Sequence, residues 1–269
     1  MLLCWVHTLC PMSRPMRWFK PWTGLWAPIW VRRRGMGGYR LPLEIFLIGI
    51  IIVAVPYFAT NNIANAYLDT VFDPEIALDR QIPVWNWTIL PYALLYMFYP
   101  ATLLLCPKDD RGYSELVVFM QMLIMVTAFC CVIFLVLPAE IDLRDQIDWD
   151  SMNAWETTLF EFIHMSDNPW NAWPSLHIVH SYLLARAMTV WIMRKRGESP
   201  ILWNAVLVTV WTEWTLLSVS ILTTKQHYLF DLLAGIIVAH LAWLALQKTL
   251  SEINDLGPNQ FAREYGWTD

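Results

Sequence analysis

The run "LVVFMQMLIMVTAFCCVIFLVL", residues 116–137, contains no charged side chain. A helix that crosses a bilayer needs about 20 predominantly apolar residues, and this run is long enough to do so. The whole chain has the same character, because 57% of its 269 residues are hydrophobic and only 15% are charged. Soluble domains carry roughly 25% charged residues. The sequence therefore predicts an integral membrane protein, and nucleic acid is not an expected partner.

Five further runs have a comparable length and composition: Leu43–Thr60, Thr88–Cys106, Pro174–Met193, Ile201–Leu222 and His227–Gln247. We therefore expect an all-α membrane bundle of about six transmembrane helices that forms one domain, residues 43–248. An N-terminal segment, 1–42, and a tail, 249–269, flank this domain. The N-terminal segment mixes basic residues with tryptophans at positions 18, 22, 26 and 30, which is typical of an interfacial helix or of an aromatic belt.

The five cysteines form no C-x-x-C pair, which argues against a zinc site or a disulfide framework. We expect them to be packing residues. They are Cys4, Cys10, Cys106, Cys130 and Cys131.

Charges of opposite sign are separated along the chain. Basic residues lie before the first run, after the second and after the fourth: Arg14, Arg17, Lys20, Arg32, Arg33, Arg34, Arg40, Lys108, Arg111, Arg194, Lys195 and Arg196. Acidic residues fill the alternate connections: Asp69, Asp73, Glu75, Asp79, Glu140, Asp142, Asp145, Asp148, Asp150, Glu156, Glu161 and Asp167. Since Lys and Arg favour cytoplasmic loops, we expect both termini inside and the acidic connections facing outward.

Polar residues whose side chains could take part in catalysis lie at the outward ends of two spans. Ser175 and His177 open the fourth run, while Lys225, His227 and Asp231 surround the start of the sixth. The connection at residues 223–226 is short, which makes the fifth and sixth spans antiparallel neighbours. The two histidines are therefore expected to face one outward pocket.

His227 and Asp231 are four residues apart, so on a helix they share a face. A carboxylate that accepts a proton from one imidazole nitrogen leaves the lone pair of the other nitrogen available for nucleophilic or base chemistry. An ionisable residue inside a span is expensive and is usually functional.

The stretch "PSLH", residues 174–177, predicts an anion site at a helix start. Pro174 suits the first helical position, and the amides of Ser175 and Leu176 would then be free to bind a phosphate. The Ser175 hydroxyl could add a hydrogen bond, and a protonated His177 could protonate a leaving oxygen. A capped helix with an interfacial histidine is the alternative interpretation.

The other histidines have weaker assignments. His180 could support the same pocket from three residues further along, whereas His7, His164 and His240 are expected to be structural. A metal site built from His177, His180, His227 and Asp231 is an alternative, but H-x-x-H alone is a common helical coincidence. We expect no metal and no cofactor.

Two segments resemble a known family. "NAWPSLH", residues 171–177, and "TTKQHYLFDLLAG", residues 223–235, resemble the second and third motifs of the type 2 phosphatidic acid phosphatase (PAP2) superfamily. "IPVWNWTILPY", residues 82–92, and "LPAEIDLR", residues 137–144, are similar to its inositol phosphorylceramide synthase-like branch. The resemblance runs from about Asp79 to the end of the last span.

The resemblance implies a metal-independent enzyme that works through a phosphohistidine. The histidine that matches His227 would attack phosphorus, the aspartate that matches Asp231 would orient it, and the histidine that matches His177 would protonate the leaving alkoxide. The serine that matches Ser175 would bind phosphate oxygens.

The sequence also departs from the family pattern. The first motif, a lysine seven residues before Arg-Pro, is absent, and Ile221 stands where an arginine usually precedes the third-motif histidine. Candidates to supply the missing positive charge to a phosphate are Lys225, Arg144 and Arg80; each could instead be a rim charge.

These features predict an integral membrane lipid phosphatase or phosphotransferase that acts at the outer face. With water as the acceptor, it would hydrolyse a phospholipid phosphate or a polyprenyl phosphate. With a lipid hydroxyl as the acceptor, it would transfer a head group in the manner of an inositol phosphorylceramide or sphingomyelin synthase. A catalytically silent transporter or scaffold with the same fold is the alternative of another class.

Overall fold

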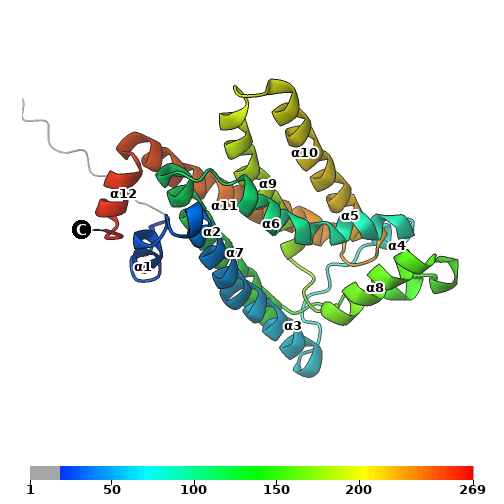
Figure 1. Ribbon diagram of the computed structural model, residues 1–269. Helices are drawn as coiled ribbons and strands as arrows, with labels where there is room; N and C mark the ends of the chain where they lie inside the picture. Colours follow the sequence, from blue (N-terminus) through cyan, green and yellow to red (C-terminus); the bar gives the residue numbers. More distant parts are fainter. Residues whose placement is uncertain (1–18, 269) are drawn as a thin grey trace, which may run out of the picture.

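The computed structural model describes residues 19–268, and every regular element in this range is helical (Figure 1). Within these residues six segments are long and apolar enough to cross a membrane, so the prediction of six spans is confirmed. They comprise α2 (Arg40–Gly49), the π-helical turn η2 (Ile50–Ala54) and α3 (Val55–Tyr67); η3 (Asn86–Thr88), α5 (Ile89–Ala93) and α6 (Leu95–Leu105); α7 (Asp110–Val136); α9 (Leu176–Lys195); α10 (Pro200–Thr223); and α11 (Leu229–Leu256). The short elements are α1 (Trp26–Val31), η1 (Met36–Gly38), α4 (Ala77–Gln81), η4 (Arg144–Gln146), η5 (Trp149–Ser151), α8 (Ala154–Ser166) and α12 (Pro258–Glu264).

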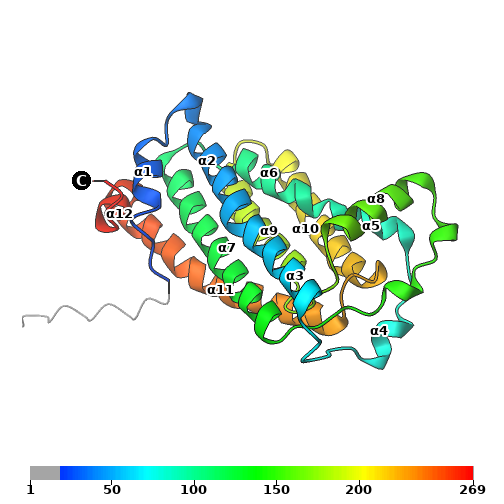
Figure 2. The ribbon, with the colours of Figure 1, turned by 90° about the horizontal axis from the view of Figure 1, so that it is seen from below.

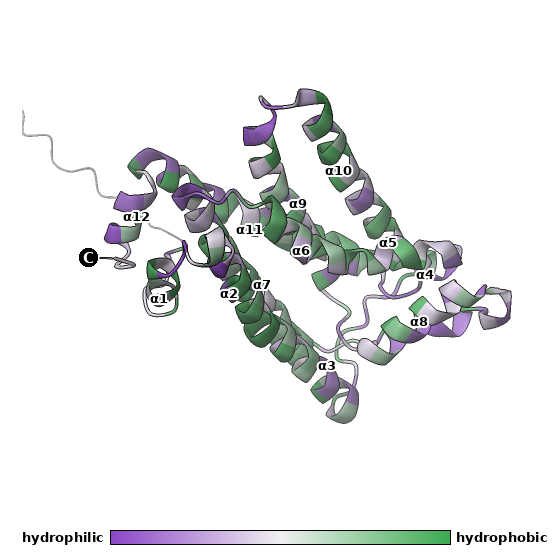
Figure 3. Cartoon of the chain, in the orientation of Figure 1, coloured by the Kyte–Doolittle hydropathy of each residue, from purple (hydrophilic) through white to green (hydrophobic). Residues whose placement is uncertain are grey.

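Helices α7 and α9 form the interior of the bundle. In their most apolar windows 72% of residues are buried, against 22% in the first span and 28% in α10. The run at residues 116–137 is therefore mostly enclosed by protein, with Phe129, Val132 and Val136 exposed towards its end, whereas the first span and α10 expose apolar side chains over most of their length, as a lipid-facing surface does. Figure 3 shows these apolar residues along the spans and more polar residues in α8 and α12.

Helix α11 approaches α9 closely next to the predicted site. A Cβ atom at Gly235 would lie 3.0 Å from the Cβ of Ile178 and 3.0 Å from the carbonyl oxygen of Ser175. Small residues allow membrane helices to pack closely. The glycine therefore permits the start of α11 to lie against the start of α9.

The N-terminal segment and the tail pack together at one end of the bundle, where α1 lies beside α12 (Figure 2). Trp26 and Trp30 are buried, and the indole of Trp267 donates to the carbonyl of Trp22 at 2.8 Å. The prediction of an aromatic belt is therefore wrong for Trp26 and Trp30, because protein covers them.

Cys4, Cys10, His7 and Trp18 lie outside the described residues. Cys106, Cys130 and Cys131 are buried and free, as packing residues should be.

The two ends of the bundle differ in charge. One end carries Arg33 and Arg34, both paired with Asp110, and Arg194, which pairs with Glu115. At the other end α3, α7 and α10 finish, α5, α9 and α11 begin, and the acidic connections with α4 and α8 cover them (Figures 1 and 2). All predicted site residues belong to this acidic end.

Candidate active site

Two imidazoles meet at the centre of the acidic end. Nδ1 of His177, in the first turn of α9, lies 3.2 Å from Nε2 of His227. Nδ1 of His227 faces two acceptors, the carbonyl of Ala172 at 3.1 Å and Oδ2 of Asp231 at 3.3 Å. That nitrogen must carry a proton, so Nε2 of a neutral His227 is an acceptor and Nδ1 of His177 is the donor. The lone pair that a nucleophile needs is therefore on the His227 nitrogen that faces His177.

Asp231 serves both the helix and the histidine. Helix α11 begins at Leu229, with Tyr228 as the N-cap, and Oδ2 of Asp231 accepts the Tyr228 amide at 2.8 Å. His227 therefore precedes the helix, and the prediction that both residues lie on a helical face is wrong for His227. The expected contact between the two side chains is present because the carboxylate folds back to cap the helix start.

The start of α9 also differs from the prediction. The helix begins at Leu176, Ser175 is its N-cap and Pro174 lies outside it. The amide of Ser175 is not free, since it donates to the carbonyl of Asp231 at 3.2 Å. The Ser175 hydroxyl makes no capping bond and is buried with no hydrogen-bond partner among residues 19–268. It is thus a donor available to a phosphate oxygen at the positive end of the α9 dipole.

Tyr92 and Asp167 contact the other nitrogen of His177, and neither was among the sequence candidates. The Tyr92 hydroxyl lies 2.8 Å from Nε2 of His177, and Oδ2 of Asp167 lies 3.9 Å from the same atom. Asp167 is only 5% exposed, although it lies in an acidic connection that was expected to face outward. Burial raises the pKa of the Asp167 carboxyl, and a hydrogen bond from Tyr57 opposes this effect.

Arg144 is the candidate cation that the fold places beside the residues around the two histidines. Its guanidinium donates to the carbonyl of Asp167 at 2.8 Å and to the side chain of Gln226 at 2.9 Å. Its Nε is buried and has no hydrogen-bond partner in the described part of the chain, and burial lowers the pKa of the guanidinium. Arg144 thus lies between Asp167, which faces His177, and Gln226, which precedes His227.

The other two candidate cations make contacts elsewhere. Lys225 is fully buried, and its ammonium donates to the carbonyls of Asp79 at 2.8 Å and Ile82 at 2.7 Å. Burial lowers its pKa. Arg80 pairs with Glu75 at 2.5 Å and with Asp142 at 3.4 Å, and its side chain is 38% exposed. In the described structure Lys225 ties the α4 region to the loop before α11, and Arg80 is a rim charge.

His180 lies one turn deeper in α9 and has both ring nitrogens engaged. Nδ1 bonds Tyr99 and Nε2 bonds Thr127, each at 2.8 Å. His164 bonds Gln226 at 3.0 Å, and burial lowers its pKa to about 4. Among residues 19–268, no group of three or more His, Cys, Asp or Glu side chains is arranged to hold a metal ion.

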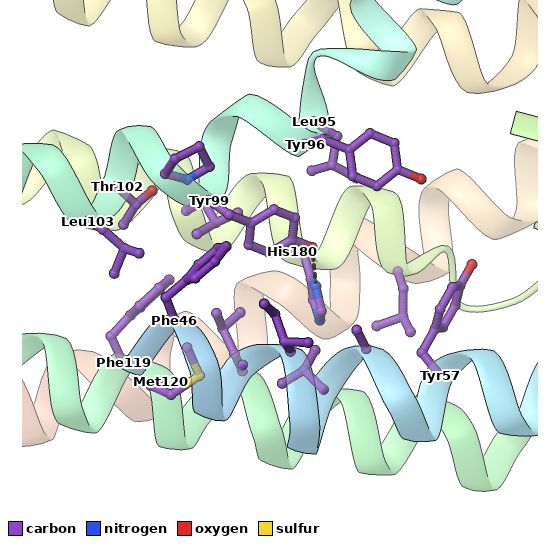
Figure 4. Close-up of a pocket in the computed structure, with 18 of the residues that line it drawn as sticks. Phe46, Tyr57, Leu95, Tyr96, Tyr99, Thr102, Leu103, Phe119, Met120 and His180 are labelled. Atoms are coloured by element: carbon purple, nitrogen blue, oxygen red, sulfur yellow. Dashed lines mark hydrogen bonds between the residues drawn. The ribbon is translucent and has the colours of Figure 1, made fainter. Parts of the chain in front are cut away.

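A cavity of about 440 Å³ adjoins the site, between the first span and α6, α7 and α9 (Figure 4). Most of its lining is apolar, with Phe46, Leu103, Phe119 and Met120 towards one end and Tyr57 towards the other in Figure 4. His177 also lines the cavity. One imidazole therefore borders both the polar group and the apolar space.

These features define a class: a six-span helical membrane protein with two histidines and a carboxylate joined at one buried end. A family model of the PAP2 superfamily matches residues 77–245, which includes both histidine motifs. The chain belongs to the PAP2 superfamily. No curated protein matches its sequence. The inositol phosphorylceramide synthase-like branch stays a prediction, and the first span lies before the matched region.

Proposed function

We propose that the protein is a membrane-embedded phosphatase or phosphotransferase that acts on lipid phosphates through a phosphohistidine. The observation that carries this proposal is that His177 borders both His227 and the apolar cavity. Its Nδ1 faces His227 at 3.2 Å, and the same side chain lines the apolar cavity of about 440 Å³. A substrate that fits both has a phosphoryl group attached to an apolar tail, and pockets of this size typically hold small lipophilic ligands.

In the first step His227 is the nucleophile. Its Nε2 forms a bond to phosphorus while the bond from phosphorus to the leaving oxygen breaks, and Nδ1–H of a protonated His177 supplies the proton to that oxygen. Asp231 and the Ala172 carbonyl hold the proton on Nδ1 of His227. The 3.2 Å contact between the rings leaves no room for phosphorus, so the rings separate when the phosphoryl group enters.

In the second step His177 is the base. Its neutral Nδ1 takes a proton from water or from a lipid hydroxyl, whose oxygen attacks phosphorus as the bond to His227 breaks. Water gives free phosphate or a phosphate monoester, whereas a lipid hydroxyl gives a new head-group lipid. Phosphoryl transfer also requires donors for the equatorial oxygens, and Ser175, the first-turn amides of α9 and Arg144 are the groups that supply them.

The active end would face the periplasm, the lumen or the cell exterior. The opposite end carries the basic residues, including Arg33, Arg34 and Arg194, and such residues favour the cytoplasmic side. The enzyme would then take its substrate from the outer leaflet.

The test uses purified full-length protein in mixed phospholipid vesicles, with phosphatidate, polyprenyl phosphate and ceramide supplied in separate reactions. Products are identified by lipid mass spectrometry, and an acid-labile phosphoenzyme is trapped with a phosphorus-labelled substrate. We expect His227→Gln to abolish both turnover and labelling while remaining folded. His240→Gln is the matched control, because His240 lies on α11 and bonds Tyr182, away from the site. A folded wild-type protein that yields neither product nor phosphoenzyme would identify a silent member of the superfamily.

A further inference from the structure

His177 has a carboxylate neighbour of its own, as His227 does. Oδ2 of Asp167 is 3.9 Å from Nε2 of His177, and the Tyr92 hydroxyl is 2.8 Å from the same nitrogen. We infer that Tyr92 and Asp167 are positioning residues that hold His177 in the protonated state that general-acid catalysis requires, and that the first span holds Asp167 in place. This inference rests on the function proposed above.

The donors around Asp167 are asymmetric. Three side chains donate to Oδ1: the hydroxyl of Tyr57 at 2.8 Å, the amide of Asn61 at 2.7 Å and the amide of Asn171 at 2.8 Å. Within residues 19–268 no donor is hydrogen-bonded to Oδ2, the oxygen nearest His177. The carboxylate is thus fixed through one oxygen and presents the other to the imidazole. Hydrogen bonds to a carboxylate favour its charged form.

Tyr57 and Asn61 belong to α3, in the span that precedes the matched region of residues 77–245. Asn61 also donates to the carbonyl of Asn168 at 3.0 Å. The first span therefore contacts the loop before α9 at the point where Asp167 faces the catalytic histidine. It contributes to the site as well as to the membrane-spanning surface.

The protonation states of His177 explain why its contacts with Tyr92 and Asp167 matter. With Nδ1–H directed at His227, Nε2 of a neutral His177 accepts from Tyr92. To give away the Nδ1 proton and end as a neutral ring, His177 must first carry a proton on Nε2 too. That proton needs an acceptor, and the cation needs an opposite charge; the Tyr92 oxygen and the Asp167 carboxylate supply them. Because the rings separate when the phosphoryl group enters, a movement of about 1 Å towards Asp167 would bring Nε2 within hydrogen-bond distance.

Several charged or titratable groups surround His177, and Asp167 is the carboxylate in closest contact with it. The groups on the facing elements are His227, Asp167, Asp231, Arg144, Tyr57, Tyr92, Tyr96 and Tyr99, with His180 on its own helix. Arg144 is the cation among these groups, and its positive charge disfavours a positive His177. An opposite charge within about 4–6 Å stabilises a charged form by the equivalent of 1–3 pH units. Asp167 therefore offsets the positive charge of Arg144.

Asp167→Asn tests this inference because it keeps the shape and removes the charge. With a lipid alkyl phosphate we expect turnover to fall at least tenfold, and we expect the pH above which turnover declines to move down by about one unit or more. With p-nitrophenyl phosphate, whose leaving group needs no proton, the rate should change by no more than about threefold. Asp150→Asn is the control, since Asp150 is an exposed carboxylate in the same connection.

Tyr92→Phe and Tyr57→Phe keep the test decisive if Asp167→Asn does not fold. Tyr92→Phe removes the direct contact and should show the same selective loss with alkyl phosphates. Tyr57→Phe should show a smaller loss of the same kind, because two donors to Oδ1 remain. Equal slowing of both substrates, or a folded Tyr92→Phe with an unchanged pH profile, overturns the inference. A wild-type protein that forms no phosphoenzyme would instead overturn the proposed function.

Discussion

Nδ1 of His177 and Nε2 of His227 lie 3.2 Å apart, although the two residues are separated by 50 positions in the sequence. Each ring has its second nitrogen engaged: His177 with Tyr92, and His227 with Ala172 and Asp231. A pair of imidazoles held in this way can divide nucleophile and acid between them. The close approach depends on Gly235, which lets α11 pack against the start of α9.

Gly235→Ala should therefore impair the site without touching a catalytic group. Its new methyl group would meet Ile178 Cβ and the Ser175 carbonyl at 3.0 Å, and both belong to the start of α9. Overpacking of this kind costs typically 1–3 kcal/mol, and a shift of α9 would lengthen the contact between the histidines. We expect a lower melting temperature and at least a tenfold loss of kcat. Gly197→Ala, whose new methyl group meets no atom of the described residues within 4 Å, should change neither.

Arg144 and Lys225 should behave differently when neutralised. Arg144→Gln should weaken inhibition by vanadate, a phosphoryl transition-state mimic, about tenfold or more, because it removes a cation from the proposed phosphate site. Lys225→Met should instead lower stability, since the Asp79 and Ile82 carbonyls lose their donor. Leaving buried acceptors unpaired costs about 1–3 kcal/mol. Vanadate inhibition constants and melting temperatures of both variants would be measured. A Lys225→Met variant that bound vanadate more weakly but kept its stability would contradict this assignment.

A larger side chain in the lining narrows the cavity and should therefore select against lipid substrates with long tails. Gly49 lines the cavity, and a Cβ there would lie 3.2 Å from the flexible end of Met120. Gly49→Leu should lower kcat/KM for long-chain lipid phosphates about tenfold and leave p-nitrophenyl phosphate nearly unaffected. The control is Ile51→Phe, because Ile51 is 64% exposed on the same span. Equal effects on long and short substrates would place the tail elsewhere.

Activity should not depend on a divalent metal. The charges proposed to act on phosphate are side chains and helix-end amides. We expect dialysis against EDTA to leave turnover unchanged and vanadate to inhibit. Loss of activity in chelator, with recovery on adding zinc or magnesium, would assign His177, His227 and Asp231 to a metal site instead.

Cysteine labelling should establish which side of the membrane the site faces. Met165 on α8 is 87% exposed at the acidic end, and Glu198 is exposed at the basic end. A membrane-impermeant maleimide should label Met165→Cys in intact cells and Glu198→Cys only after lysis, with the unmodified chain as background. The reverse pattern would place the active end in the cytoplasm.

The sequence by itself determined the spans, the separation of charge and the core of the site. Hydropathy acts over one helix length, so runs such as residues 116–137 predict spans without knowledge of their neighbours. Asp231 is only four residues from His227, so the carboxylate that caps the start of α11 also reaches the ring of His227, and the motif around Ser175 and His177 is continuous. These features depend on short-range spacing, which a sequence displays directly.

The tertiary structure alone decided which other side chains complete the site. Tyr92 reaches His177 from the second span, and Tyr57 and Asn61 reach Asp167 from the first. The sequence placed Asp167 in an acidic connection expected to face outward, yet the fold buries its side chain. Lys225, the cation nearest His227 in sequence, is directed to backbone carbonyls, whereas the more distant Arg144 lies at the site. The physical reason is that a polar group's role depends on the partners that satisfy it after burial, and those partners come from helices far apart in the chain.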